Sequence, residues 1–421
     1  MKKIICSIFL LNLLLIAFSH SGFTVDIAGS ESDCQPLVYD LDDDGQLEFV
    51  VAFNNGLLKL YENDGTEILN VFWARHLSGP AQEKVAIFPG ENEKQIIVTT
   101  YNGKVYSIDV TGEKTEGWEE EIDINGINSK NFILSAPEID AENNKIFFTS
   151  QVGKVYVVDK KKNYLWQYQT DGPVSSSVIY EDIDGDGIPE IIFKSDNGTV
   201  YVFNSDYKML SGWPVTVKEN YYSMPYPINV ADINNDGNKE IVFPTNKFKD
   251  KYYVYIMGND GNIISKIETD SKIYKKIELN DIDSDGVKDL VYSDVEGKLF
   301  IKNIQGKNIK GWPVNELKKI KGKPYLIDID GDGKAEVVVV GTSDGLNYYI
   351  RAYTSDGKRV GDEYLIGNLS DILDFNCFYL GDADDDGYLD AVFVNDGKLQ
   401  LIPTSYFTPV KLKIMGVEYE Y

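Results

Sequence analysis

An acidic nonapeptide constrains the fold of this chain more than any other feature, because its pattern occurs six times. The chain has DIDGDGIPE at residues 182–190 and DIDGDGKAE at residues 328–336. The general pattern is Asp, any residue, Asp or Asn, any residue, Asp, Gly, two residues, and Asp or Glu. We number the copies loops 1 to 6 in chain order; they occupy residues 40–48, 182–190, 232–240, 281–289, 328–336 and 382–390.

The spacing of these loops predicts a repeat protein. From loop 2 onward they follow one another at 50, 49, 47 and 54 residues, whereas loops 1 and 2 lie 142 residues apart, close to three periods. Two further units without the acidic pattern fit into that gap, at residues 84–109 and 135–159. Eight units of about 48 residues therefore account for almost the whole chain.

Each unit is rich in signals for β-structure. An apolar run ends at the loop, a run such as EIIFK follows, an NG, DG or EG turn comes next, and an alternating strand such as GTVYVFN completes the visible pattern. Because one small antiparallel sheet cannot cover its own hydrophobic faces, such units pack radially. The sequence predicts an all-β chain that forms a β-propeller of eight blades with four antiparallel strands each. Seven blades are the alternative, if a terminal unit only closes the ring.

The predicted boundaries divide the chain into four segments. They are a signal peptide at residues 1–21, a lead-in segment at 22–34, the eight repeats at 35–416 and a short C-terminal tail at 417–421. Lys2 and Lys3 precede an apolar run at residues 4–18 that small residues follow, which is typical of a secretory signal. We therefore expect a secreted protein, or a periplasmic or cell-surface one.

The N-terminal run is not expected to anchor the mature protein. It is shorter than the roughly 20 residues that a membrane span requires, and we expect no later span. Cys6 lies ahead of the apolar run rather than after it, so a lipid anchor is not expected either.

The charge of the chain limits its partners. The formal net charge is −26, from 67 acidic and 41 basic side chains. Such a charge repels phosphates, which argues against nucleic acid and anionic membranes as partners. Hydrophobic residues make up 43% and aromatic residues 12%, so this is not a disordered acidic chain.

The loops have the chemistry of a calcium site. Side-chain oxygens at positions 1, 3 and 5 point to one centre, Gly at position 6 permits the turn, a main-chain carbonyl at position 7 faces inward, and the acid at position 9 closes the shell. Hard oxygen ligands in this number suit Ca²⁺ better than Mg²⁺. An EF-hand would need an acid at position 12 and flanking helices. Position 12 is instead apolar in every loop: Val51, Phe193, Phe243, Tyr292, Val339 and Phe393.

The loop and blade pattern resembles the FG-GAP or VCBS-type repeats of integrin α-subunit propellers and of secreted microbial proteins. That resemblance implies up to six Ca²⁺ ions, with ligands at positions 1, 3, 5 and 9 and the carbonyl of position 7. The implied residues, loop by loop, are Asp40, Asp42, Asp44, Gln46 and Glu48; Asp182, Asp184, Asp186, Ile188 and Glu190; Asp232, Asn234, Asp236, Asn238 and Glu240; Asp281, Asp283, Asp285, Val287 and Asp289; Asp328, Asp330, Asp332, Lys334 and Glu336; and Asp382, Asp384, Asp386, Tyr388 and Asp390.

The chain departs from that family pattern in two respects. No literal FG or GAP sequence occurs, and Asn234 replaces an acid in loop 3, which should weaken that site. The two units without loops resemble quinoprotein-type repeats, and this resemblance implies that Trp118 and Trp166 pack blade against blade. It does not imply a quinone cofactor.

The sequence contains no recognisable catalytic motif. GxSxG, HExxH, CxxC and phosphate-loop patterns do not occur, and His76 is the one histidine of the expected mature chain. Cys34 and Cys377 occupy nearly matching places in the first and last units. A disulfide between them is conceivable, but the Cα separation limit of roughly 7 Å favours two thiols.

Two functional classes remain open at this stage. One is a non-catalytic binding or adhesion module for a protein or carbohydrate ligand at the cell surface or outside the cell. The other is a calcium-dependent polysaccharide lyase or hydrolase on the same scaffold. The absence of a recognisable catalytic motif and the short predicted loops favour binding, although a fold alone does not decide function.

Overall fold

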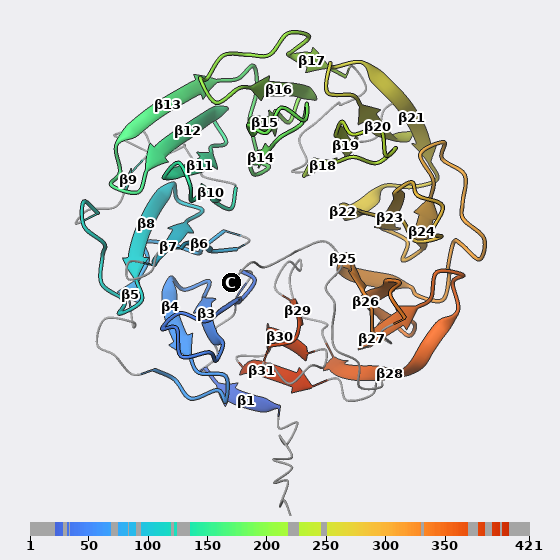
Figure 1. The fold of residues 1–421 in the computed structure, drawn as a ribbon. Coiled ribbons are helices and arrows are strands. Elements are labelled where there is room, and N and C mark those ends of the chain that lie inside the picture. The colour runs from blue at the N-terminus through green and yellow to red at the C-terminus, as the bar shows by residue number, and fades with distance from the viewer. Residues whose placement is uncertain are drawn as a thin grey trace, which may run out of the picture.

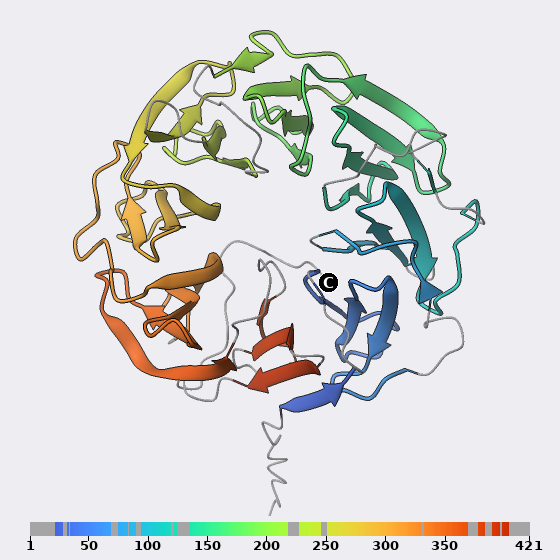
Figure 2. The ribbon, with the colours of Figure 1, turned by 180° about the vertical axis from the view of Figure 1, so that it is seen from behind.

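Eight small antiparallel sheets stand around a central axis (Figures 1 and 2). This computed structural model describes residues 22–27, 32, 34–68, 75–82, 84–89, 94–118, 122–123, 135–217, 227–245, 251–329, 332–368, 378–383, 390–395 and 398–403. The predicted all-β, eight-bladed propeller is confirmed, and the seven-bladed alternative is wrong. Within these residues, no helix has the length and apolar character needed to cross a membrane.

The strands of each blade run from the ring centre outward in chain order. Blades 1 to 4 consist of β2 (Leu37–Tyr39), β3 (Glu48–Ala52), β4 (Leu57–Tyr61) and β5 (Arg75–His76); β6 (Ala86–Phe88), β7 (Gln95–Thr99), β8 (Lys104–Asp109) and β9 (Ile122–Asp123); β10 (Glu138–Asp140), β11 (Lys145–Thr149), β12 (Lys154–Asp159) and β13 (Tyr164–Gln169); and β14 (Ile179–Glu181), β15 (Glu190–Lys194), β16 (Thr199–Phe203) and β17 (Val215–Thr216).

The second half of the ring follows the same order with two exceptions. Blades 5 to 8 consist of β18 (Asn229–Ala231), β19 (Glu240–Pro244), β20 (Tyr252–Met257) and β21 (Ile263–Thr269); β22 (Ile273–Asn280), β23 (Asp289–Asp294) and β24 (Leu299–Lys302); β25 (Lys319–Ile327), β26 (Glu336–Thr342), β27 (Asn347–Tyr353) and β28 (Arg359–Asn368); and β29 (Tyr379–Gly381), β30 (Asp390–Asn395) and β31 (Lys398–Pro403) with β1 (Phe23–Asp26). In blade 6, an isolated bridge between Leu299 and Val314 stands in place of a fourth strand.

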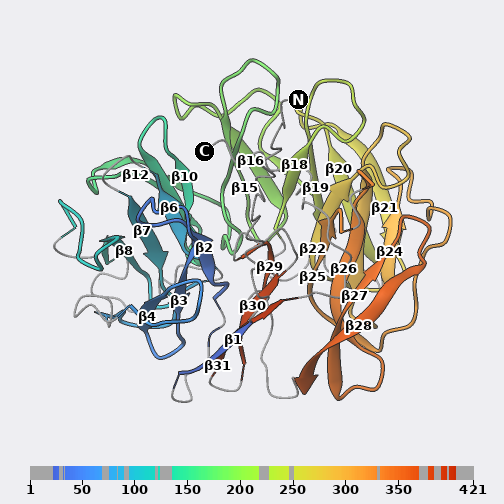
Figure 3. The same cartoon turned by 60° about the horizontal axis from the view of Figure 1, so that its bottom comes forward.

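The ring is closed by pairing of the two ends of the chain. β1 runs antiparallel to β31, with Phe23 opposite Leu401 and Asp26 opposite Lys398, so it is the outer strand of blade 8 (Figure 3). The segment 22–34, which we expected to be a lead-in, thus contains a strand of the propeller. Main-chain pairing within blade 8 therefore joins residues that are almost a full chain length apart.

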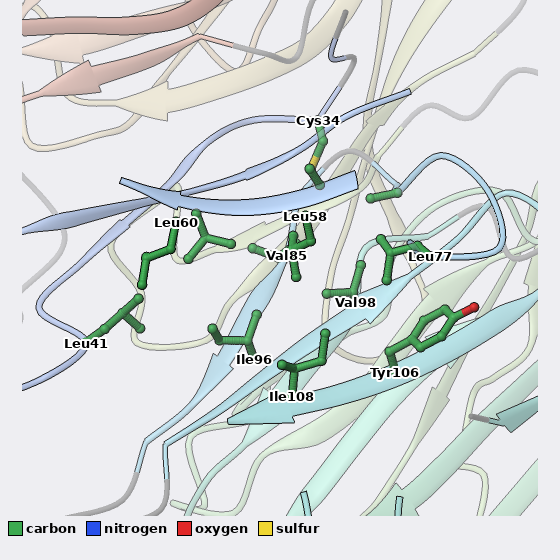
Figure 4. Close-up of a cluster of buried hydrophobic side chains, with 13 residues drawn as sticks. Cys34, Leu41, Leu58, Leu60, Leu77, Val85, Ile96, Val98, Tyr106 and Ile108 are labelled. Carbon is green, nitrogen blue, oxygen red and sulfur yellow. The ribbon is translucent and has the colours of Figure 1, made fainter. Parts of the chain in front are cut away.

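The hydrophobic core lies between adjacent blades. The second strand of most blades is buried along its whole length, as in EIIFK of β15, because neighbouring blades cover both of its faces. Figure 4 shows the cluster between blades 1 and 2, where Leu60 and Ile96 lie among buried aliphatic side chains and Cys34 lies at the edge of the group. Cys377 and the His76 side chain lie outside the described residues, so the possible disulfide stays a prediction.

Tryptophan side chains join blades at the outer part of the ring. The indole Nε1 of Trp118 donates to the carbonyl oxygen of Lys160 in the next blade, at 2.8 Å. Trp213 and Trp312 make the corresponding bond to their next blades, at 3.1 Å and 2.8 Å. Trp166 packs against Phe203 of blade 4, with ring centroids 4.9 Å apart. The blade-to-blade packing expected for Trp118 and Trp166 is confirmed.

Candidate metal sites

All six acidic loops connect the first strand of a blade to its second strand, and the acid at position 9 is the first residue of that second strand. In each loop this acid is 0% to 3% exposed. One of its oxygens accepts a hydrogen bond from the main-chain N–H at position 2. The donors are Leu41 (2.6 Å), Ile183 (3.2 Å), Ile233 (3.0 Å), Ile282 (3.1 Å), Ile329 (3.0 Å) and Ala383 (2.8 Å).

The first and fifth positions shape the turn itself in loops 1 to 5. The carboxylate at position 1 accepts the N–H of the glycine at position 6, as in Asp182 and Gly187, at 2.9 Å to 3.0 Å. The carboxylate at position 5 accepts the N–H of position 7 at 2.8 Å, as in Asp186 and Ile188. Gly187 has φ of 84°, a conformation that disfavours any residue with a Cβ.

Among the described residues, three loops gather carboxylates into groups that could hold a cation. One oxygen from each of three side chains lies within 4.8 Å of the others in loops 1, 2 and 4. The groups are Asp40, Asp42 and Glu48; Asp182, Asp184 and Glu190; and Asp281, Asp283 and Asp285. Asp44, Asp186 and Asp289 were predicted as ligands but are not members of these groups. The carbonyl ligands at position 7 stay a prediction.

The buried ninth acid is electrostatically strained when no cation is nearby. Burial, together with the charges of the neighbouring aspartates, raises the pKa of Glu48 and of Glu190 to about 7 against one lowering hydrogen bond. Burial and the loop aspartates likewise raise the pKa of Asp289 to about 7. A cation at the centre of the loop would remove this repulsion.

Loop 1 also contains buried oxygens that no hydrogen-bond donor reaches. These are Oδ1 of Asp40 and Oε1 of Glu48, the latter on the same carboxylate whose other oxygen accepts the Leu41 N–H. A buried carboxylate oxygen without a partner is costly, because it has lost its water and gained nothing in return. An oxygen-binding cation fits this set of donors.

Loop 3 differs from loops 1, 2 and 4. Asn234 Nδ2 donates to Asp236 Oδ2 at 3.0 Å and to Glu240 Oε1 at 3.1 Å. The amide thus supplies hydrogen bonds at the place where the other loops have only carboxylates. The weaker cation binding expected for loop 3 stays a prediction.

Loops 5 and 6 are described in part. Asp330 in loop 5 and Asp384, Asp386 and Tyr388 in loop 6 lie outside the described residues. The described part of loop 5 makes the same main-chain hydrogen bonds as the complete loops: Asp328 accepts from Gly333, Asp332 from Lys334, and Glu336 from Ile329. In loop 6, the main-chain N–H of Ala383, the residue after Asp382, donates to Asp390.

Blades 2 and 3 lack the acidic loop, and each has a lysine near the place where that loop ends in the other blades. The sequence pattern did not predict a role for these two lysines. Lys94 Nζ of blade 2 reaches back to loop 1, at 2.8 Å from the carbonyl oxygen of Asp40 and 2.5 Å from Asp43 Oδ1. In blade 3, Lys145 of β11 lies opposite Asp140 of β10. Lys145 thus occupies the register position that the ninth acid has in the other blades, as Glu190 does opposite Glu181. The Nζ of Lys145 lies 3.8 Å from Asp140 Oδ2.

The Lys145→Met variant should be destabilised with or without calcium. The Lys145 and Asp140 side chains are 12% and 5% exposed, so the variant leaves a buried carboxylate without its cation. We expect the free energy of unfolding to fall by about 2 kcal/mol in urea titrations. Lys358→Met is the matched control, because its pair with Asp356 is solvent-exposed and should contribute nothing measurable. Equal midpoints for the two variants would contradict the structural role of Lys145.

The fold and the loops define an eight-bladed β-propeller, one part of which is similar to an FG-GAP-like repeat. Residues 182–243, from loop 2 into β19, match the family model described as the FG-GAP-like repeat. The resemblance on which the loop ligands were assigned is thereby confirmed for this part of the chain.

Two curated relatives and two solved structures are similar to the chain. Proteins named lambda-carrageenase from Pseudoalteromonas carrageenovora and from a Pseudoalteromonas species are 24% and 23% identical over 262 residues. The match covers 60% of this chain and 22% of each relative, so the chain spans about a fifth of their length.

The solved structures show similarity of fold alone. BamB from Moraxella catarrhalis superposes with a TM-score of 0.58 at 14% identity, over 90% of this chain and 98% of that chain. The Dos1 propeller superposes with a TM-score of 0.57 at 11% identity, over 90% of this chain and 93% of that one.

Proposed function

We propose that this protein is a calcium-loaded β-propeller that binds an anionic polysaccharide outside the cytoplasm and does not cleave it. The observation that carries the proposal is the similarity over 262 residues to two proteins named lambda-carrageenase. Lambda-carrageenan is a sulfated polysaccharide, so its chemistry suggests the ligand class. The N-terminal apolar run supports the extracytoplasmic location.

Calcium would act as a structural ion in this proposal. The residues that would hold it are the side chains at positions 1, 3, 5 and 9 of each loop. The unpaired buried oxygens of Asp40 and Glu48 support this assignment, since a cation is what they lack. When bound, Ca²⁺ would supply positive charge and oxygen coordination, which neutralise the self-repulsion of each loop.

Binding is favoured over catalysis by the way the loops engage their carboxylates. The ninth acid of every loop is buried and accepts a main-chain hydrogen bond, as Glu190 does from Ile183, so it is held as a fixed acceptor. A proton-transferring group would need access to substrate. The name of the two relatives favours the alternative, a calcium-dependent lyase or hydrolase.

One experiment separates these functions. The purified protein would be titrated with lambda-carrageenan oligosaccharides in millimolar Ca²⁺ by calorimetry, and the same mixtures assayed for new reducing ends and for the absorbance of unsaturated products. Saturable binding without either product supports the proposal. Product formation would establish the enzymatic alternative. No binding to this or to any other anionic glycan would overturn the proposal and favour a protein ligand.

A further inference from the structure

The inner strands of blades 6 and 7 contain the same irregularity at the same place. In β22 the register with β23 shifts between Tyr274 and Glu278, and in β25 the register with β26 shifts between Lys321 and Tyr325. In each case the inner strand advances by four residues while its partner advances by two. The inner strand therefore has two extra residues, which form a bulge. β22 and β25 are neighbours that border the ring centre (Figures 1 and 2).

The two bulges have matching backbone conformations and matching lysines. Lys275 has φ of 66° and Gly322, its counterpart, has φ of 72°. A lysine in the left-handed region is uncommon, because its Cβ is crowded there, and such residues gather at functional sites. The next residue in each strand is a lysine, Lys276 and Lys323. Bulges of this kind re-aim side chains and are frequent beside binding sites.

Both lysines share a single carboxylate. Glu278 Oε1 lies 3.0 Å from Lys323 Nζ and 3.8 Å from Lys276 Nζ. Both lysine side chains keep 37% of their surface accessible, whereas Glu278 keeps 19%. Two ammonium groups with one glutamate leave an excess of positive charge that solvent or a ligand can reach.

Charges from other blades also act around the ring centre, among them the carboxylate of Glu138 in blade 3, which interacts with Lys84 and with Glu181. Burial lowers the pKa of Lys276; Glu278 opposes that shift, while Lys323 and Lys84 of blade 2 lower it further. Blade 2 lies across the ring from blade 6, so the lysines influence one another through the centre (Figure 1). Glu181 of blade 4 is paired with Lys239. Because burial and the neighbouring lysines disfavour the charged form of Lys276, a bound anion would oppose this shift.

We propose that Lys276 and Lys323 form a subsite at the ring centre for a sulfate group of the polysaccharide. This inference rests on the proposed function and specifies where a chain of formal charge −26 can accept an anionic glycan. Charge-assisted bonds from two ammonium groups are the chemistry that recognises an oxyanion. Glu278 orients both lysines and competes with the ligand for them.

The first test locates the anion without any glycan. Crystals of the calcium-loaded protein would be soaked in sodium selenate, and anomalous difference maps calculated at the selenium edge. We expect a selenium peak within hydrogen-bond distance of Lys276 Nζ and Lys323 Nζ. Peaks elsewhere only, or none, would overturn the subsite.

The second test measures affinity in variants. Lys276→Met and Lys323→Met should each weaken binding of a sulfated carrageenan oligosaccharide by roughly tenfold, and the double variant by roughly a hundredfold. Lys251→Met is the matched control, because it removes the same charge from an exposed pair with Glu268 and should leave the affinity unchanged. Melting temperatures of all variants verify that they are folded.

Glu278→Gln gives a test of opposite sign. If Glu278 competes with the ligand, the variant should bind the sulfated oligosaccharide several-fold more tightly, whereas a purely structural ion pair would give equal or weaker binding. A uronate oligosaccharide in parallel distinguishes a sulfate subsite from a general carboxylate subsite.

The outcomes separate the subsite from the proposed function. If the wild-type protein binds the glycan and the double lysine variant binds it equally well, the subsite is wrong and the proposed function stands. If selenate occupies the subsite and no glycan binds, the subsite stands and the proposed function fails.

Discussion

Removal of calcium with EDTA should lower the melting temperature of this protein by about 20 °C. A ligand present at 100 times its Kd stabilises the folded state by about 2.7 kcal/mol, and up to six loops would contribute together. In the metal-free protein, burial and then repulsion from the loop aspartates raise the pKa of Glu48 and of Glu190, so their charged forms are costly without a cation. Differential scanning calorimetry in EDTA, followed by millimolar Ca²⁺, measures the loss and its recovery. Mg²⁺ should restore less, because it prefers fewer protein ligands.

A variant of one loop should change the melting temperature in opposite directions with and without calcium. Asp184→Asn removes one charge from the carboxylate group of loop 2. In Ca²⁺ the variant should melt below the wild-type protein, since one site is weakened. In EDTA it should melt at the same temperature or higher, because the repulsion is smaller. Asp206→Asn, at an exposed position outside the loops, is the control. Melting curves that EDTA leaves unchanged would refute the calcium assignment and reduce the loops to turns.

Deletion of the closing strand should have the second largest effect. A chain that begins after residue 27 lacks β1 and loses its pairing with β31. It also loses Ile27, which is 5% exposed, and Val25 from the cluster between blades 8 and 1. We expect the free energy of unfolding to fall by about 5 kcal/mol from lost apolar burial and main-chain hydrogen bonds.

The deletion should also change the association state. Without β1, the edge of β31 is open to pairing with another chain, so we expect dimers or larger species in size-exclusion chromatography. A chain that begins at Gly22 is the control, because it keeps β1. Equal urea midpoints and equal elution volumes for the two chains would show that closure does not depend on this strand.

The repeat pattern was sufficient to predict the blades but not the closure. The spacing of loops 1 to 6 predicts the period and places the ninth acid at the start of a strand, because an apolar run begins directly after that acid. The four residues FTVD of β1 precede the first repeat unit, and their partner lies at residues 398–401. A pairing over that separation leaves no trace in local periodicity.

The candidate sites were predictable to a similar extent. The acids of each loop follow from spacing, whereas the role of Lys94 and Lys145 does not, since an isolated lysine is most often a surface residue. The bulges in β22 and β25 were hidden because they lengthen the inner strands without disturbing the repeat. Only the register of each strand with its neighbour reveals the two extra residues.

The lysines of blades 2 and 3 make the dependence of the ring on calcium uneven around its circumference. Lys94 and Lys145 cannot dissociate as a calcium ion can, because they are part of the chain. Their positive charges therefore stay beside Asp43 and Asp140 at any calcium concentration. Lys239 occupies the matching position beside loop 2, where its Nζ pairs with Glu181, so blade 4 shares this support. When calcium falls, amide hydrogen exchange should therefore increase earlier in a blade with a complete acidic loop, such as blade 6, than in blades 2 and 3.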